Sequence, residues 1–472
     1  MTSAETSRTT ADPAAKGVYG ARFLAPLFLG PLLNPINTTM ISVALVPISR
    51  DLGVPSSTVV WLVAGLYLTS AIAQPTLGRV GDVLGPRRVY AAGLVVVAVA
   101  GVLPTLLGGF GPVVAARVLL GVGTSAAYPS VMAMIRERSR RAGVETPPVV
   151  LSGISISTLT TASIGPVLGG ALIQLFGWRS IFLVNVPLAA VALVMLLLWV
   201  PADEPRADLP AAQRPGLRDL DPVGIVLFAG TVASLLVFSL GLDNPRWWLL
   251  GITVAAALAL LWWELRRSGP FIDFRMLAAN GALTRTYFRM LLLYLGFYSM
   301  TYGYTQWVQD DAGFSSSQAG FLQLPTAVLA GVMSLVVART AKVRGPILVA
   351  CAAPVVGGVL MVWLHSSSPL LYLLVIAAFF GIGQGLASVS NQQVLYRQSP
   401  ADRIGTASGL SRTFVYLGAI LSSGVLGAAF GDAPSDGDVH LIALIVVGCA
   451  GVAFLMALLD GALRGVAPAT KG

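Results

Sequence analysis

The sequence predicts an all-α integral membrane protein with fourteen transmembrane helices, arranged as two six-helix bundles and one inserted helix pair. Three observations predict it: an apolar composition, fourteen apolar segments of spanning length, and a glycine pattern that occurs in both halves. The chain of 472 residues has a mean hydropathy of +0.80 and only 11% charged residues. An average soluble domain has about 25% charged residues. So few charges cannot coat a water-facing surface of this size, so most of the surface is expected to meet lipid.

Fourteen apolar segments are long enough to cross a bilayer, since a spanning helix needs roughly 20 mostly apolar residues. They lie at about 24–48, 58–77, 89–108, 111–135, 148–174, 180–200, 222–241, 246–265, 284–309, 315–338, 345–365, 368–395, 403–430 and 439–463. The apolar–polar alternation of a membrane barrel strand does not occur in them. Residues 1–22 are predicted to be a disordered cytoplasmic tail, and residues 465–472 a second cytoplasmic tail.

A short glycine pattern occurs twice and indicates two related halves. The stretch RVLLGVGTSAA at 117–127 resembles AAFFGIGQGLA at 377–387, with Gly-x-Gly in the middle of both apolar segments. Parallel halves related by an axis along the membrane normal are typical of transporters, which bind substrate between the halves near the bilayer midplane. The sequence therefore predicts a transporter.

The repeat sets the expected domain boundaries. Residues 23–200 are predicted to form an N-terminal six-helix bundle, and residues 284–464 a C-terminal six-helix bundle. Residues 222–266 are an inserted helix pair. Cytoplasmic linkers at 201–221 and 267–283 join this pair to the two bundles.

Arginines are distributed unevenly among the loops, and this predicts the orientation. With the N-terminal tail inside, the outer loops hold only Arg50, Arg179 and Arg246, and the inner loops hold clusters of basic residues. Cytoplasmic loops of membrane proteins carry such an excess. The 27 arginines against three lysines favour a bacterial source. We therefore expect a multi-pass protein of the bacterial cytoplasmic (inner) membrane with both termini cytoplasmic, and no nucleic-acid partner for its net charge of +9.

Reactive and metal-binding side chains are scarce. Cys351 and Cys449 lie in apolar segments and are typical of small buried hydrophobic residues. The chain has two histidines, His365 and His440, and no visible carboxylate pair, nucleophile triad or metal cluster. The sequence therefore predicts neither an enzyme nor a metal or organic cofactor.

The loop GRVGDVLGPRR at 78–88 places three arginines and an aspartate in an otherwise apolar chain. The spacing of its glycines, Asp82 and the final arginine pair resembles the signature loop of the major facilitator superfamily. The resemblance implies that Asp82 accepts hydrogen bonds from a helix N-terminus in the opposite half, and pairs with arginines of 136–141, while the cytoplasmic side is closed. The alternative is that these arginines only set the topology. The gating residues expected here are Gly78, Asp82, Gly85, Arg87, Arg88 and Arg136.

The segment IGPVLGGALIQLFGWRSIFLVNVP at 164–187 predicts a kinked helix with one smooth face. It is similar to the antiporter motif of drug exporters in the same superfamily. Together with PFIDFRML at 270–277, it resembles the fourteen-helix drug:proton antiporter branch. The alternative is that glycine and proline are simply common in membrane helices. The gating residues expected in this segment are Gly165, Pro166, Gly169 and Gly170.

The resemblance implies a secondary active transporter that exports drugs or secondary metabolites by alternating access. It further implies antiport driven by a proton gradient, with no bound cofactor. The expected partners are a small amphipathic substrate and the lipid bilayer, and the protein is expected to be a monomer.

The sequence also departs from this branch. Asn37 stands where the branch often has an aspartate, Leu120 where a glutamine is usual, and Thr161 in place of the first glycine of the antiporter motif. No carboxylate lies in the interior of any apolar segment, although a membrane-buried acid is the natural proton carrier. Proton coupling is therefore implied by the resemblance and not by these residues.

Basic and aromatic residues occupy the interior positions instead. Arg117 and Arg412 are predicted to bind substrate, couple transport or brace helices, and Arg289 is expected to snorkel to the surface. Tyr287, Tyr294, Tyr298 and Tyr302 share one helical face, which suits either an amphipathic binding cavity or helix packing. The residues expected to bind substrate or couple transport are Asn37, Gln74, Arg117, Tyr294, Tyr298, Tyr302, Asn391, Gln392 and Arg412.

Three other functions remain open at this point. The missing interior acid is compatible with an uncoupled or differently coupled carrier of neutral or anionic substrates. The inserted helix pair is compatible with a lipid carrier that opens toward the bilayer. A membrane sensor without transport activity is the alternative from another class.

Overall fold

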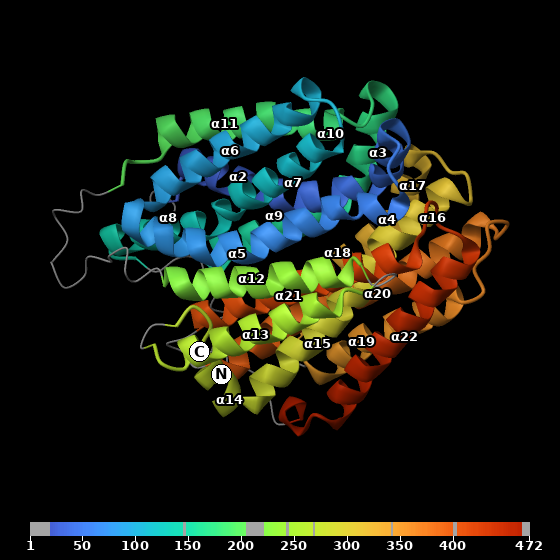
Figure 1. Ribbon diagram of the computed structural model, residues 1–472. Helices are drawn as coiled ribbons and strands as arrows, with labels where there is room; N and C mark the ends of the chain where they lie inside the picture. Colours follow the sequence, from blue (N-terminus) through green and yellow to red (C-terminus); the bar gives the residue numbers. More distant parts are fainter. Residues whose placement is uncertain are drawn as a thin grey trace, which may run out of the picture.

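The computed structural model of the chain is an assembly of long helices packed side by side (Figure 1). It describes residues 19–144, 148–203, 221–241, 245–267, 270–340, 343–399 and 404–464, without the side chains of 148–149, 151–160, 163 and 404–406. Most of the predicted first tail, the whole second tail and most of the linker at 201–221 lie outside the described residues. Within these ranges every regular element is a helix.

The N-terminal bundle contains the helices between residues 21 and 199. They are α2 (Ala21–Met40), η1 (Ile41–Val43), α3 (Leu45–Leu52), α4 (Ser56–Val59), α5 (Trp61–Leu84), α6 (Pro86–Leu106), α7 (Phe110–Ser125), α8 (Ala127–Ala142), α9 (Pro148–Phe176), α10 (Ser180–Leu183) and α11 (Asn185–Trp199). Three prolines lie inside α2, and the chain bends by 59° where it continues into α3.

The C-terminal bundle follows after three intervening helices. These three are α12 (Pro222–Ser239), α13 (Trp247–Glu264) and the short α14 (Phe274–Ala279). The bundle consists of α15 (Gly281–Tyr298), the π-helical turn η5 (Ser299–Tyr304), α16 (Thr305–Asp310), α17 (Ser316–Leu322), α18 (Leu324–Ala338), α19 (Arg344–Met361), α20 (Leu370–Gln398), α21 (Ile404–Ala429), α22 (Asp436–Leu459) and η7 (Gly461–Leu463).

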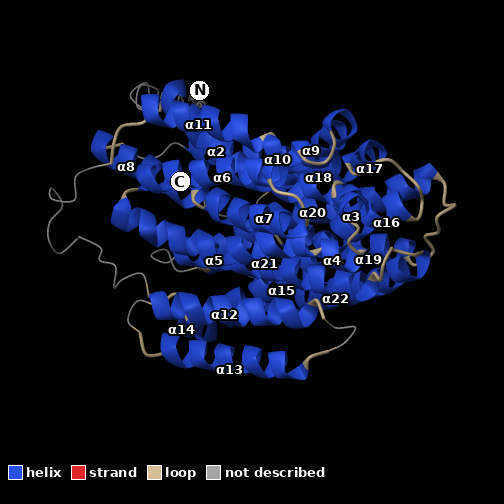
Figure 2. Cartoon of the chain, turned by 45° about the horizontal axis from the view of Figure 1, so that its top comes forward, coloured by secondary structure: helices blue, strands red, loops and turns tan. Residues whose placement is uncertain are grey.

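The inserted pair lies against both bundles. Helix α12 packs on α5 of the N-terminal bundle and on α21 of the C-terminal bundle, and α13 packs on α12. Figure 2 shows α13 at the edge of the molecule, outside α12. The exposed Trp247, Trp248 and Trp262 of α13 are suited to contact lipid rather than protein.

The repeated glycines make equivalent contacts in the two halves. A Cβ on Gly121 would lie 2.8 Å from a carbonyl oxygen of α5, and one on Gly123 would lie 2.7 Å from a carbonyl oxygen of α6. In the second half, a Cβ on Gly381 would lie 2.5 Å from a carbonyl oxygen of α18, and one on Gly383 3.2 Å from one of α19. Each glycine pair therefore lets one helix pack closely between the two helices that precede it.

Eleven helices of the described residues are long and apolar enough to cross a membrane, or twelve if the bent pair Ala21–Val43 and Leu45–Leu52 is one span. Of α9, the described stretch Ile164–Phe176 counts only as a shorter apolar helix. Helix α15 is not counted, because Arg285 and Arg289 lower its hydropathy. The protein is therefore an all-helical membrane protein with eleven to twelve candidate spans, and the fourteen-span arrangement stays a prediction.

Candidate functional site

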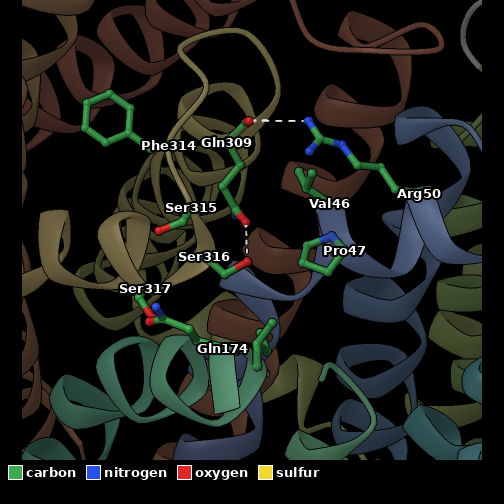
Figure 3. A pocket seen from close by; sticks show the side chains of 10 residues that line it. Val46, Pro47, Arg50, Gln174, Gln309, Phe314, Ser315, Ser316 and Ser317 are labelled. Atoms are coloured by element: carbon green, nitrogen blue, oxygen red, sulfur yellow. Dashed lines mark hydrogen bonds between the residues drawn. The ribbon is translucent and has the colours of Figure 1, made fainter. Parts of the chain in front are cut away.

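The two bundles are tied together at one end of the molecule, which we call the Arg50 seam. Arg50 on α3 pairs with Asp310 on α16, with 2.6 Å between Nη2 and Oδ1. The same Nη2 donates to the Gln309 carbonyl at 3.4 Å, beside a cavity of about 330 Å³ (Figure 3). The Ser56 backbone N–H donates to the Asp432 carbonyl at 3.1 Å. An ion pair and main-chain hydrogen bonds therefore hold the bundles together here.

Helix α9, which contains Pro166, contributes close backbone packing to the same seam. A Cβ on Gly170 would lie 2.7 Å from the Ser316 carbonyl oxygen of α17, and one on Gly320 would lie 2.5 Å from the Pro166 carbonyl oxygen. The Ser317 hydroxyl donates to the Gly170 carbonyl at 2.9 Å. The two helices can approach this closely only because neither glycine carries a side chain.

The remaining glycines of the α9 motif face the first helix of the same bundle. A Cβ on Gly165 would overlap the Thr39 hydroxyl, and one on Gly169 would lie 3.0 Å from the Met40 carbonyl oxygen. The α9 motif is therefore packed on both sides, against α2 within its own bundle and against α17 across the seam. This position suits the predicted gating role.

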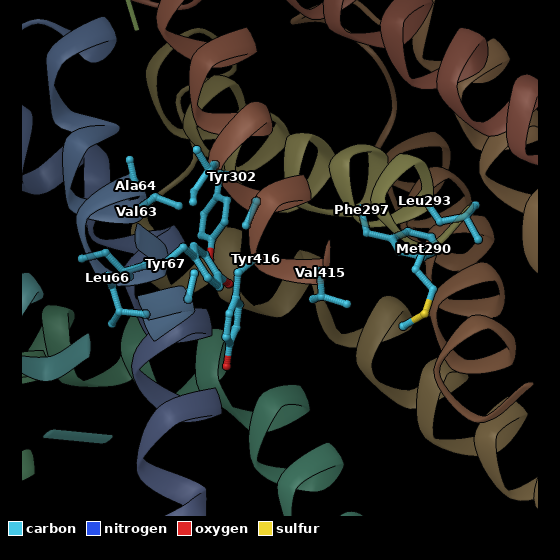
Figure 4. Packing of buried hydrophobic residues seen from close by; sticks show 14 of the residues in the cluster. Val63, Ala64, Leu66, Tyr67, Met290, Leu293, Phe297, Tyr302, Val415 and Tyr416 are labelled. Carbon is cyan, nitrogen blue, oxygen red and sulfur yellow. The ribbon is translucent and has the colours of Figure 1, made fainter. Parts of the chain in front are cut away.

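Tyrosines from both bundles meet midway along the interface (Figure 4). The Tyr67 and Tyr302 hydroxyls lie 3.0 Å apart, and the Tyr302 hydroxyl donates to the Thr38 carbonyl at 2.7 Å. The Tyr298 and Tyr302 rings are stacked with centroids 5.9 Å apart, and the Tyr67 and Tyr298 centroids are 5.0 Å apart. Tyr298 and Tyr302 of the predicted stripe thus face the opposite bundle, whereas the ring of Tyr294 contacts Phe297 and Tyr298.

Helix α21 extends this group with a tyrosine and an arginine. The Tyr416 hydroxyl donates to Gln74 Oε1 of α5 at 2.8 Å. Arg412 lies one turn earlier, with its Cζ 5.7 Å from the centroid of the Tyr128 ring of α8. Its side chain is exposed to the space between the bundles. Gln74 and Arg412, both expected to bind substrate or couple transport, therefore each contact a tyrosine of the opposite bundle.

Asn37 is engaged within the N-terminal bundle. Its Nδ2 donates to Asn185 Oδ1 at 2.5 Å, and Asn185 Nδ2 donates back to Asn37 Oδ1 at 2.9 Å. Arg117 donates to two backbone carbonyls, from Nε to Leu62 at 2.7 Å and from Nη1 to Asn37 at 2.9 Å. Asn37 and Arg117 are 3% and 1% exposed. Both side chains therefore join α2, α5, α7 and α11, and Arg117 lies near Tyr67 and Tyr302 of the midway group.

Arg289 and Asn391 lie inside the C-terminal bundle. Arg289 Nη2 donates to Asn391 Oδ1 at 3.2 Å and to Thr286 Oγ1 at 3.3 Å. The expectation that Arg289 snorkels to the surface is wrong, because its side chain is 0% exposed. Gln392, the next residue of α20, is half-buried. Tyr287 also packs within this bundle, where its hydroxyl donates to the Ala407 carbonyl at 2.9 Å.

The loop at 78–88 lies at the opposite end of α5 from the Arg50 seam, and we call this the Arg88 end. Asp82 faces Arg79 and Arg136, both from its own bundle. In the parts of the chain that the structure describes, Asp82 has no hydrogen bond to the C-terminal bundle. Gly78 packs on Pro129 of α8. A Cβ on Gly78 would lie 3.3 Å from the Pro129 Cβ. The predicted latch across the bundles is thus not formed in this arrangement, in which the opposite end is closed.

A different carboxylate binds a helix N-terminus at this end. Asp203 accepts hydrogen bonds from the backbone N–H groups of Arg87 at 2.9 Å and Arg88 at 3.0 Å, which are in the first turn of α6. Gly85 has a φ of +99°, and a Cβ there would overlap the Asp203 carboxylate. Negative charge is favourable at a helix N-terminus. The glycine before Pro86 therefore makes room for this carboxylate.

The family model described as "Major Facilitator Superfamily" matches residues 27–423. The chain belongs to the Major Facilitator Superfamily. It is therefore a secondary transporter and multi-pass membrane protein, and not an enzyme.

Members of the superfamily from bacteria resemble the chain over most of its length. The uncharacterized MFS-type transporter YwoD of Bacillus subtilis is 33% identical, and the match covers 94% of this chain and 97% of that protein. The multidrug efflux pump LfrA of Mycolicibacterium smegmatis is 28% identical, over 90% of this chain and 83% of that protein. The solved nucleoside transporter NupG has the same fold, with a TM-score of 0.64, 13% identity, and coverage of 92% of this chain and 99% of that one.

The sequence did not single out five residues that make these contacts. Tyr67, Tyr128 and Tyr416 are single tyrosines in separate segments, so no spacing connects them to the stripe of α15. Asp203 follows the sixth apolar segment directly, and a signal for it exists in the acidic stretch PADEP at 201–205. Asn185 was part of a recognised motif, but nothing in the sequence paired it with Asn37.

Proposed function

We propose that the protein exports amphipathic small molecules, such as drugs or secondary metabolites, by alternating access. It works as a monomer with fourteen spans in the bacterial cytoplasmic membrane, with both termini and the Arg88 end in the cytoplasm. The Arg50 seam then faces outward. The arrangement described above is the one that loads substrate from the cytoplasm.

The distribution of contacts between the bundles carries this proposal. All hydrogen bonds that join described residues of the two bundles lie at the Arg50 seam or at the midway tyrosines, and the pair Gln74–Tyr416 is nearest the Arg88 end. Arg412 and Tyr128 are exposed just beyond that pair. A transporter that takes up substrate from the cytoplasm requires a closed outer end and a binding site near the midplane that the cytoplasm can reach. The name of the efflux pump LfrA supports the direction of transport.

Proton coupling is part of the proposal through the family resemblance. The chain has no carboxylate in any predicted helix interior, and the midway group consists of tyrosines, the Gln74 amide and Arg412. This observation favours a second candidate function, an uncoupled or differently coupled carrier of neutral or anionic molecules. The two candidates differ in whether substrate movement carries protons.

Transport by the purified protein in sealed liposomes tests both candidates. With a pH gradient imposed, a fluorescent amphipathic dye should cross faster than in protein-free liposomes, and a protonophore should abolish the difference. An enclosed pH indicator should report proton movement that depends on the dye. Dye movement without proton movement supports the uncoupled carrier. Dye movement no faster than in protein-free liposomes contradicts the proposed export.

A further inference from the structure

Arg412 differs from the other two arginines in the helix interiors. Arg117 and Arg289 are at most 1% exposed and donate hydrogen bonds to protein oxygens. Arg412 is exposed and, among the described residues, has neither a hydrogen bond nor an ion pair. It is eight residues from the start of α21, which is about 12 Å along the helix. Its charge is therefore deep in the molecule and not neutralised by a carboxylate.

Aromatic rings surround this guanidinium from three helices. The titratable groups that face it are Tyr128 of α8, Tyr294 and Tyr298 of α15, and Tyr416 of its own helix. None of them is negatively charged at neutral pH. A guanidinium offers several N–H donors in a planar fork that matches a carboxylate. The donors of Arg412 are thus free to bind a negatively charged group that enters between the bundles.

We propose that Arg412 and the neighbouring tyrosines bind aromatic carboxylates, which are the substrate class of this transporter. The carboxylate accepts hydrogen bonds from Arg412, and the ring of the substrate packs against Tyr128 and Tyr298. Stacked or edge-on contacts between aromatic rings are favourable. This inference rests on the proposed function for its claim about substrates, but the binding itself does not require transport.

The same geometry disfavours cationic substrates. A lipophilic cation would approach Arg412 without a carboxylate to offset the repulsion, because the acids of this chain lie at helix ends and in loops. Binding of a positively charged ligand commonly uses an acid in the membrane interior. Selectivity for anions over cations therefore follows from one arginine and a missing acid.

Three matched ligands test the proposal on the purified full chain by calorimetry. They are naphthoate, its neutral amide naphthamide and naphthylmethylammonium, which share one ring system and differ in charge. Naphthoate should bind about tenfold more tightly than naphthamide, as expected for hydrogen bonds to a charged group. The ammonium compound should bind more weakly than either. Equal affinity for all three ligands overturns the proposal.

Arg412→Gln assigns the preference to this residue. The variant should bind naphthoate and naphthamide with equal affinity, and unchanged naphthamide binding shows that the site is still folded. Arg412→Lys keeps the charge without the planar fork and should keep part of the preference. Arg266→Gln, which removes an exposed arginine stacked on Trp262, is the control for net charge and should behave like the unchanged protein. A preference that persists in Arg412→Gln overturns the proposal.

Failure of the proposed export and failure of the proposed carboxylate binding can be told apart. Dye transport in liposomes without any preference for naphthoate leaves the proposed exporter intact and removes this inference. Binding preference that depends on Arg412, with no flux of naphthoate or dye, removes the exporter and leaves an anion-binding site.

Discussion

The Arg50 seam and the Arg88 end are built from different interactions. At the seam, backbone meets backbone across the bundles through Gly170 and Gly320, and the pair Arg50–Asp310 adds charge. At the Arg88 end, described contacts of the loop acids stay within one bundle, as Asp203 does on α6. Closure of the first end thus depends on close backbone packing, whereas Asp203 at the second end is bound within its own bundle. Substitutions should therefore act differently at the two ends.

The largest effect is expected for Gly170→Leu at the seam. Its Cβ would lie 2.7 Å from the Ser316 carbonyl oxygen and 2.9 Å from the Ser317 Cα, so the two backbones must separate. Overpacking of this kind costs about 1–3 kcal/mol. The rate of maleimide labelling of Gln309→Cys, which is 3% exposed in the closed seam, should rise roughly five- to hundredfold.

The labelling is measured in a protein in which Cys351 and Cys449 are replaced, because maleimide also reacts with these two free cysteines. Gly230→Leu is the matched control, because a Cβ on Gly230 meets nothing within 4 Å. Labelling that is equally slow in the Gly170 and Gly230 variants would show that the seam is not held by close backbone packing.

The next largest effect is expected for Asp203→Ala at the Arg88 end. The change leaves two N–H groups of the first turn of α6 without their acceptor, and loss of such a cap costs about 0.5–2 kcal/mol. The midpoint of thermal unfolding should fall, while labelling at the seam stays unchanged. Asp203→Asn keeps one acceptor oxygen and should lose less stability. An unchanged midpoint in Asp203→Ala contradicts the capping role.

A smaller effect is expected for Arg50→Ala. The arginine side chain is 63% exposed, so the ion pair with Asp310 is screened by solvent and is expected to contribute about 0.2–1 kcal/mol. Labelling of Gln309→Cys should rise by at most about fivefold. Exchanging the two charges in Arg50→Asp with Asp310→Arg should restore slow labelling, and failure to do so would assign the effect of Arg50 to its bond with the Gln309 carbonyl.

An effect of similar size, confined to transport, is expected for Asp82→Asn. The latch implied by the family resemblance forms only when the Arg88 end closes. The variant should therefore fold like the unchanged protein, and maleimide labelling of Gln309→Cys at the seam should stay equally slow. A carboxylate at a helix N-terminus contributes about 0.3–1 kcal/mol, and transport should therefore slow by about two- to fivefold. Transport at the unchanged rate would remove the latch from the mechanism.

Much of the fold could be predicted because its signals are local. Spanning length and the spacing of Gly121 and Gly123 can be read in one segment, and the matching pair at Gly381 and Gly383 makes the same contacts in the second half. The stacking of Tyr298 of α15 on Tyr302 of η5 could be predicted for the same reason, since residues four apart share a helical face.

The rest of the site could not be predicted because it depends on pairs distant in sequence. Asn37 looked like a substitute for a coupling acid, but its amide is bonded to Asn185, which is 148 residues away. Tyr67 and Tyr302 are 235 residues apart. Such pairs form through packing of whole helices, and no spacing within one segment encodes them.

The contact between Gly85 and Asp203 has a consequence for evolution. The two positions are distant in sequence, yet any side chain at the first would occupy the space of the second. Loss of the carboxylate removes one of the two reasons for glycine, leaving the positive φ as the other. Among homologous sequences, an acid at position 203 should therefore occur with glycine at position 85, and the two positions should covary.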